Sequence, residues 1–268
     1  MCDRRMASPT GNRQEQELTG IAFAEAGKRW CTPCFVLFLL LCAAPSPGAR
    51  ADGSQFSPPS PADVGVRVEK PVGDGKLYSQ GSGIFLGDGL VLTVAHVVNV
   101  DPDNPRVTVI LDGWRIDGTL VSEGQREKLD LALIKIPPQA LSPKRRVQTM
   151  VPICSGNPGT SQPVVVASMG VVTAATTIST PITSDGQTGT WTNLLNTGYH
   201  HGNSGGGVFS PRDGCLWGII NIELSGPSLE DGHFIDLTAF VPAAKITPFL
   251  DAYRARLAGT KGGERQTR

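Results

Sequence analysis

The stretch Gly202-Asn203-Ser204-Gly205-Gly206 decides how the fold of this 268-residue chain is interpreted. It sets a serine among glycines, and two earlier segments, Thr93–His96 and Asp130–Leu133, add a histidine and an aspartate in the order His, Asp, Ser. A serine hydroxyl is a poor nucleophile unless an imidazole accepts its proton and a carboxylate fixes the tautomer of that imidazole. The three segments therefore predict acyl-transfer chemistry.

The glycines around Ser204 also suit an oxyanion hole. Such a site needs two backbone N–H groups aimed at one point, and glycine permits the sharp turn. Gly202 and Ser204 are the expected donors. The alternative interpretation, a nucleophile elbow, needs a helix directly after the serine and the order Ser, Asp, His. Residues 207–211 instead indicate a short strand and a turn, which speaks against the elbow.

Three sequence blocks resemble those of the chymotrypsin-like (S1 clan) serine peptidases. They are a histidine block at 81–98, an aspartate block at 129–136 and a serine block at 202–206. The chain is most similar to the compact bacterial branch that includes the Deg-type proteases, and no PDZ-sized segment is expected after it. The resemblance runs from about Val64 to about Leu257 and implies that His96, Asp130 and Ser204 are catalytic.

Asn203 departs from part of this family. Animal digestive enzymes carry Asp there, and that Asp pairs with a newly cleaved N-terminus. The resemblance therefore implies a peptidase that matures without such a switch.

The resemblance implies an all-β fold of two six-stranded antiparallel β-barrels, chymotrypsin-like, with a C-terminal helix. The composition is consistent with this fold, since 32 glycines and 21 prolines supply many turns and only 18% of residues are charged. The net charge of zero gives no electrostatic reason to expect a nucleic-acid partner. Protein or peptide substrates are the expected partners.

The expected peptidase domain spans residues 64–258. It divides into a first barrel at 64–136, a crossing at 137–150 and a second barrel at 151–241. Alternating apolar residues and turn pairs predict the strands: 65–69, 79–86, 90–95, 106–111, 115–121, 131–136, 163–169, 171–177, 190–196, 207–209, 216–222 and 233–240.

A helix is predicted at 246–257, because Phe249, Tyr253 and Leu257 recur at helical spacing. A disordered tail is expected at 259–268. The basic triplet Lys144–Arg146 is interpreted as a solvated surface run, with a processing site as the alternative.

Residues 1–51 are interpreted as a signal peptide with an N-terminal extension. Lys28-Arg29 precede the apolar run Cys34–Ala44, which is short for a membrane-spanning helix, and Ala49-Arg50-Ala51 fits a cleavage site. The alternative is a buried or uncleaved anchor helix. Cleavage would give a secreted or periplasmic protein without stable membrane association, beginning near Asp52 with a flexible lead-in at 52–63.

Signal cleavage would leave Cys154 and Cys215 in an oxidising compartment. In the family's fold both regions tend to lie away from the cleft, so the resemblance makes a disulfide plausible. A zinc site from these cysteines and the histidines would lack the usual ligand spacing. No metal or other cofactor is expected.

The remaining site residues concern specificity and come from the resemblance. Gly198, six residues before Ser204, falls at the pocket floor, Tyr199 and His201 border the pocket, and Asn221 and Glu223 form the opposite wall. Without a floor aspartate, we expect weak cleavage after Arg or Lys and a preference for small or medium apolar residues.

Of the other histidines, His200 is expected with His201 in a partly exposed loop, with contact to substrate as the alternative, and His233 is expected in a structural position.

Two functional classes remain open. The first is an exported serine endopeptidase that works through an acyl-enzyme intermediate. The second is a non-catalytic relative with a trypsin-like fold that binds peptides through the same cleft.

Overall fold

The computed structural model describes residues 58–101, 103–125, 128–178, 182–183, 190–191, 193–227 and 234–263. All of them belong to one compact unit, Ser54–Arg268. The predicted signal segment at 1–51 lies outside the described residues. None of the helices that are described is both long and apolar enough to span a membrane.

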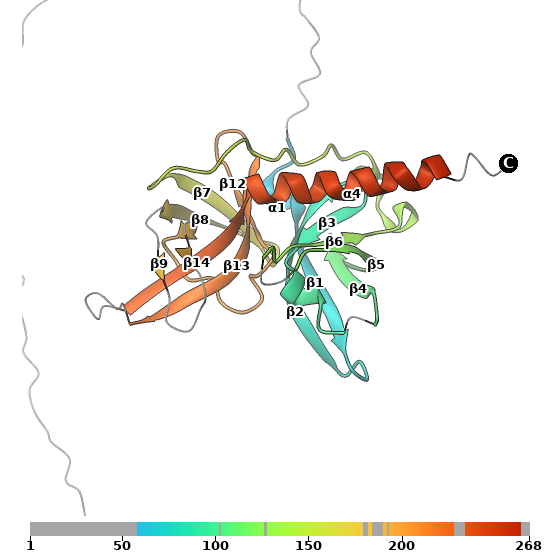
Figure 1. Cartoon of the computed structure of the whole chain (residues 1–268), viewed down its shortest axis with the longest axis horizontal. Coiled ribbons are helices and arrows are strands. Elements are labelled where there is room, and N and C mark those ends of the chain that lie inside the picture. The colour runs from blue at the N-terminus through green and yellow to red at the C-terminus, as the bar shows by residue number, and fades with distance from the viewer. Residues whose placement is uncertain are drawn as a thin grey trace, which may run out of the picture. The chain divides into compact units, whose positions relative to one another are not determined.

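The first half of the unit forms a closed antiparallel barrel with strand order β1-β2-β3-β6-β5-β4 (Figure 1). Its strands are β1 (Gly65–Val72), β2 (Leu77–Gly87), β3 (Leu90–Thr93), β4 (Arg106–Leu111), β5 (Trp114–Glu123) and β6 (Ala132–Lys135). β1 closes the barrel by pairing with both β2 and β4.

The second half forms another closed barrel, with order β11-β14-β13-β12-β7-β8. Its strands are β7 (Pro163–Ser168), β8 (Val171–Ile178), β11 (Leu194–Leu195), β12 (Gly207–Phe209), β13 (Leu216–Pro227) and β14 (Phe234–Pro242). A separate two-stranded sheet joins β9 (Ile182–Thr183) to β10 (Thr190–Trp191). The predicted fold of two six-stranded barrels is therefore confirmed.

Local patterning accounts for the strands. In β4 the residues Val107, Val109 and Leu111 are buried and alternate with more exposed ones, as expected for a strand with one face in the core. The next strand begins after Asp112-Gly113, both with positive φ, which is the backbone that a tight hairpin turn requires.

The C-terminal helix α4 (Ala243–Gly263) is longer than the predicted 246–257 and occupies the first part of the expected tail. Ile246, Phe249 and Tyr253 are buried in a hydrophobic cluster that includes core residues of both barrels. Leu257, predicted on the same face, is 48% exposed. Leu257 is not part of that cluster, so the apolar spacing extends one turn further than the buried face of the helix.

Two short helices lie in segments where the sequence predicted no helix. α1 (Pro61–Val64) occupies the end of the expected flexible lead-in, with Ser60 as N-cap and Pro61 at the first helical position. α3 (Pro143–Arg146) lies in the crossing, which also contains the 3-10 helix η1 (Pro138–Ala140).

The interpretation of Lys144–Arg146 as a solvated run is wrong for its central residue. The Arg145 side chain is only 3% exposed. Its guanidinium donates to both carboxylate oxygens of Asp112 and to Gln148, and it lies over the Phe85 ring, 5.9 Å from the centroid. Burial is tolerated because most of its donors find acceptors.

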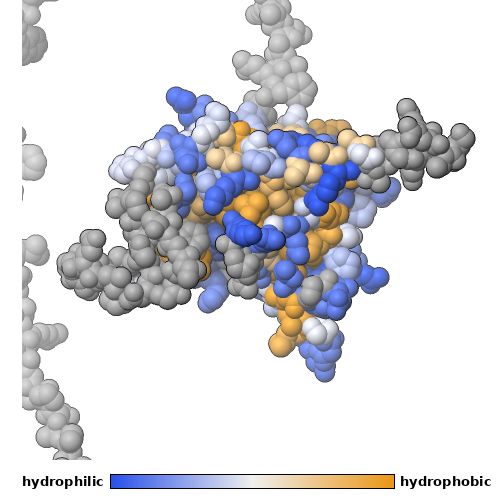
Figure 2. Space-filling model, in the orientation of Figure 1, coloured by the Kyte–Doolittle hydropathy of each residue, from blue (hydrophilic) through white to orange (hydrophobic). Residues whose placement is uncertain are grey.

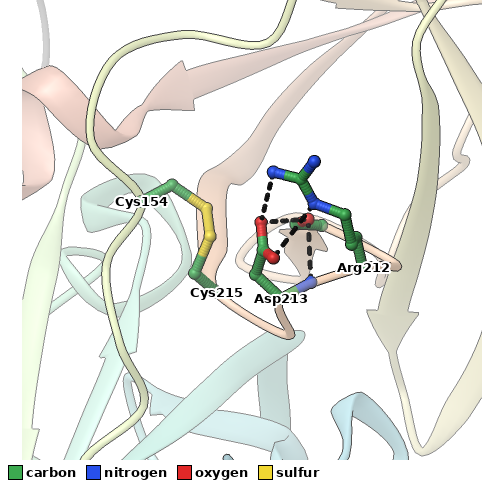
Figure 3. Close-up of a disulfide and its surroundings, with 5 residues drawn as sticks. Cys154, Arg212, Asp213 and Cys215 are labelled. Carbon is green, nitrogen blue, oxygen red and sulfur yellow. Dashed lines mark hydrogen bonds and ion pairs between the residues drawn. A yellow bond between two sulfur atoms is a disulfide. The ribbon is translucent and has the colours of Figure 1, made fainter.

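A disulfide joins Cys154 to Cys215, with a Cα–Cα distance of 5.1 Å (Figure 3). Cys154 lies in the segment that enters the second barrel, and Cys215 ends the turn after β12. The Cys154 N–H donates to the Leu216 carbonyl, so backbone pairing already brings the two segments together.

The β1–β2 hairpin carries exposed apolar side chains near its end. Leu77 is 70% exposed and Tyr78 is 47% exposed. Figure 2 shows hydrophobic atoms on this hairpin, in the lower part of the view.

Candidate active site

The predicted catalytic residues come from both barrels. His96 lies on the short helix α2 (Ala95–Val98), directly after β3, and Asp130 lies just before β6. Ser204 lies on the loop between β11 and β12 of the second barrel. All three line one cavity of about 530 Å³. The remaining lining residues are Tyr199, His200, His201, Asn221, Ile222, Glu223 and Ser225.

Two short contacts join His96 to Asp130. The Nδ1 of His96 lies 2.6 Å from Oδ2 of Asp130, and the His96 backbone N–H donates to Oδ1 at 2.9 Å. The carboxylate can only accept, so Nδ1 carries the proton and Nε2 is left as an acceptor. Asp130 is 7% exposed, and burial strengthens its hold on the imidazole.

The Ser204 hydroxyl has a different partner in this state. Its Oγ donates to the backbone carbonyl of Asn221 at 3.2 Å. Within the described part of the chain no hydrogen bond joins it to His96. Asn221 belongs to β13, so the wall strand that lines the cavity also orients the hydroxyl.

The turn around Ser204 leaves two N–H groups free. Among the residues that the structure describes, no acceptor binds the N–H of Gly202 or of Ser204. Their carbonyls point elsewhere: Ser82 donates its hydroxyl to the Gly202 carbonyl at 2.8 Å and its N–H to the Ser204 carbonyl at 2.7 Å. Gly202 has φ +96°, which a side chain would strain. The pair is suited to bind an oxyanion.

Gly205 shows why this turn needs glycine. Its φ is +93°, and a Cβ there would overlap the Ser82 carbonyl. The Ser82 carbonyl in turn accepts from Thr93 Oγ1 at 2.7 Å. Ser82 is thus a central anchor of the site. It lies inside the Gly81-Ser82-Gly83 part of the histidine block, but sequence reasoning assigned it no role.

Asn203 is held by two local hydrogen bonds. Its Oδ1 accepts from Ser168 Oγ at 2.7 Å, and its Nδ2 donates to the His200 carbonyl at 3.0 Å. The amide can make both contacts because it is at once donor and acceptor. It therefore ties the Ser204 loop to the end of β7.

Four of the predicted pocket residues, Tyr199, His201, Asn221 and Glu223, do line the cavity. Burial raises the pKa of the Tyr199 phenol, and its 2.6 Å hydrogen bond with Thr173 opposes part of that rise. Gly198 does not line the cavity but contacts Asp236.

His200 was expected in an exposed loop. Its side chain is 75% exposed and lies 3.1 Å from Glu223. His233 lies outside the described residues. In the described ranges no group of three His, Cys, Asp or Glu side chains is arranged to hold a metal ion.

The sequence pattern of the trypsin-like peptidase domain matches residues 81–219, which contain all three predicted catalytic residues. No curated protein matches the chain.

The fold is similar to that of the Rv3671c protease from M. tuberculosis. The active form is 18% identical with a TM-score of 0.51, covering 71% of this chain and 80% of that one. The inactive form is 19% identical with a TM-score of 0.50, covering 72% and 89% respectively. At this identity the similarity concerns the fold.

Proposed function

The chain belongs to the family of trypsin-like peptidase domains, and we propose on this basis that it is a serine endopeptidase. The single observation that carries the proposal is the 2.6 Å contact between His96 and Asp130 in the cavity that Ser204 also lines. A nucleophile, a base and a group that orients the base are the minimum set for acyl transfer through a serine.

In the first half of the reaction, Ser204 Oγ attacks the carbonyl carbon of the scissile bond. Its proton passes to His96 Nε2, and Asp130 stabilises the imidazolium that forms. A rotation about the Ser204 Cα–Cβ bond would move the hydroxyl from the Asn221 carbonyl to Nε2. Such hydrogen bonds are often loose in free enzymes and tighten when substrate binds.

The negative charge on the former carbonyl oxygen is received by the N–H groups of Gly202 and Ser204. Collapse of the tetrahedral intermediate breaks the peptide C–N bond, and His96 gives its proton to the leaving amine. Water then attacks the acyl-enzyme ester, with His96 again as base. This releases the acid product and restores the Ser204 hydroxyl.

The best test is covalent labelling with a fluorophosphonate probe. An activated serine beside its base and its oxyanion donors should react, and the probe should modify the parent chain at Ser204 alone. Ser204→Ala should abolish labelling and lower peptide turnover by roughly 10⁴ to 10⁶-fold. An unlabelled but folded parent chain would favour the non-catalytic peptide-binding alternative.

We also propose that the protein is exported with removal of residues 1–51. The basic pair before the apolar run Cys34–Ala44 and the Ala49-Arg50-Ala51 pattern support this. The mature chain should begin at or near Asp52, as N-terminal sequencing of the exported protein would determine. A mature start upstream of Cys34 would contradict the proposal.

A further inference from the structure

Met169 lies in the turn that connects β7 to β8, and its backbone is strained. Ser168 pairs with Val171, so Met169 and Gly170 form a two-residue hairpin turn. Both have positive φ, +52° for Met169 and +78° for Gly170, and this backbone is rare for a side chain such as methionine. Strain of this kind persists only where the surrounding contacts hold it in place.

The contacts that hold Met169 are with the turn that carries Ser204. The Met169 N–H donates to Ser82 Oγ at 2.9 Å, and the same hydroxyl donates to the Gly202 carbonyl at 2.8 Å. The thioether lies against Gly202, since a Cβ built on that glycine would lie 3.4 Å from Met169 Cε and 3.5 Å from Sδ. The sulfur is therefore next to a residue whose N–H has no acceptor among the described residues.

Met169 is also open to small solutes. The residue is 38% exposed. It lines a second cavity, of about 390 Å³, whose lining includes Arg67, Asp112 and Arg145. This cavity shares no lining residue with the one that contains Ser204. A small molecule can thus reach Met169 without entering the candidate active site.

Met150 provides a contrast within the same chain. It is less exposed than Met169 and packs against the hydrophobic cluster that both barrels share. Met169 belongs to none of the hydrophobic clusters that the described residues form. The other two methionines, Met1 and Met6, belong to the segment whose removal we propose. Because oxidation of a side-chain sulfur depends on its exposure, Met169 should react before Met150.

We propose that Met169 is a reversible oxidation site through which a hydroperoxide lowers the activity of this peptidase. A lone pair on Sδ attacks one peroxide oxygen, and the S–O bond forms as the O–O bond breaks. The leaving oxygen takes the proton from the oxygen that is now bound to sulfur, which gives water. The thioether is oxidised to a sulfoxide and the peroxide is reduced. The effect on turnover rests on the proposed peptidase function.

The sulfoxide changes the surroundings of Gly202 in two ways. Its oxygen is a hydrogen-bond acceptor beside an N–H that has none, so it competes with the oxyanion for that donor. The added polar group also disturbs the van der Waals contact that holds the thioether against Gly202. Met169 is thus a positioning residue. Its oxidation should lower kcat and change KM little, because the oxyanion donors act mainly in the transition state.

The first experiment treats the purified protein with hydrogen peroxide and follows oxidation by peptide mass spectrometry. Met169 should be oxidised before Met150. As the Met169 sulfoxide forms, kcat for one peptide should fall by roughly 10²-fold, with KM and the unfolding temperature nearly unchanged. Methionine sulfoxide reductases for both sulfoxide epimers should restore kcat.

Two matched variants locate the effect, each compared with its own untreated sample. Met169→Leu has a similar apolar volume but no sulfur to oxidise, so peroxide should leave its kcat unchanged. Met150→Leu should lose activity as the parent does. An equal loss in Met169→Leu and the parent, or full activity in a parent whose Met169 is completely oxidised, would overturn the inference.

Oxidation of the Ser204→Ala chain separates this inference from the proposed function, because it needs no turnover. Peroxide should again oxidise Met169 before Met150, and the amide NMR signal of Gly202 should shift as the sulfoxide forms. These changes, together with a parent that fluorophosphonates do not label, would reject the peptidase and keep the oxidation site. A labelled parent in which Met169 oxidation alters neither the Gly202 signal nor kcat would keep the peptidase and reject the regulation.

Discussion

At the scale of single residues, the Asn203 side chain fixes the loop that carries Ser204. Its amide accepts from Ser168 and donates to the His200 carbonyl, on either side of the turn that presents the two free N–H groups. This local arrangement is consistent with maturation that needs no new N-terminus at the position where digestive relatives use one.

Asn203→Asp is the corresponding test. A carboxylate can still accept from Ser168, but it cannot donate to the His200 carbonyl and would repel that oxygen. The turn should loosen, and kcat should fall by roughly 10- to 100-fold with little change in KM, because the oxyanion donors act mainly in the transition state. Steady-state kinetics on one peptide would measure this, and an unchanged kcat would contradict the assigned role.

At the scale of elements, the Cys154–Cys215 bridge ties the entry to the second barrel to the turn after β12. It closes a loop with a sequence separation of 61 residues. The cross-link restricts the unfolded chain, so Cys154→Ala with Cys215→Ala should lower the free energy of unfolding by ~2–4 kcal/mol. Urea denaturation would measure the change. Reduction of the parent should have the same effect, and two free thiols in the denatured mature parent would reject the bridge.

The crossing segment is anchored by an ion pair whose contribution to stability depends on pH. The Arg145 guanidinium beside Asp112 holds the pKa of that carboxyl below its usual value. A lowered folded-state pKa adds stability at pH values above the unfolded pKa, near 3.9, and that stability is lost as pH falls through the folded value.

Asp112→Asn should therefore make the free energy of unfolding depend less on pH between about pH 5 and pH 2. Thermal unfolding across this range would show it. The control is Asp117→Asn, at an exposed aspartate whose side chain makes no hydrogen bond to the described residues, and it should keep the parent's slope. Equal slopes in the parent and Asp112→Asn would contradict the coupling.

At the scale of the whole molecule, α4 connects the last strand of the second barrel to a core that both barrels share. Ile246, Phe249, Leu250 and Tyr253 are buried with residues such as Ile84 of β2 and Phe209 of β12. Because the proposed catalytic residues are divided between the barrels, any element that fixes the barrels together also supports the candidate site.

Phe249→Ala tests this connection. Phe249 is 8% exposed, and removing its ring should cost about 3–5 kcal/mol of unfolding free energy. Leu257→Ala is the matched control on the same helix, since Leu257 is 48% exposed and such changes stay within about 0.5 kcal/mol. Equal losses in the two variants would show that α4 does not contribute through packing.

The sequence by itself determined what local patterns encode. Alternation and turn pairs predicted most strands within a few residues, because side-chain period and turn backbone are properties of adjacent residues. The three blocks likewise predicted the set of His96, Asp130 and Ser204, since each residue has a distinctive local setting, and the three line one cavity in the structure.

Only the tertiary structure decided which distant groups meet. Ser82 reaches the Gly202 carbonyl across 120 residues, Arg145 is buried against Asp112 instead of being solvated, and Asp236 occupies the space beside Gly198. None of these partners is adjacent in sequence, and barrel closure and strand register set their distances. The physical reason is that a side chain's charge, burial and partners depend on the strands packed around it, which no short window of sequence contains.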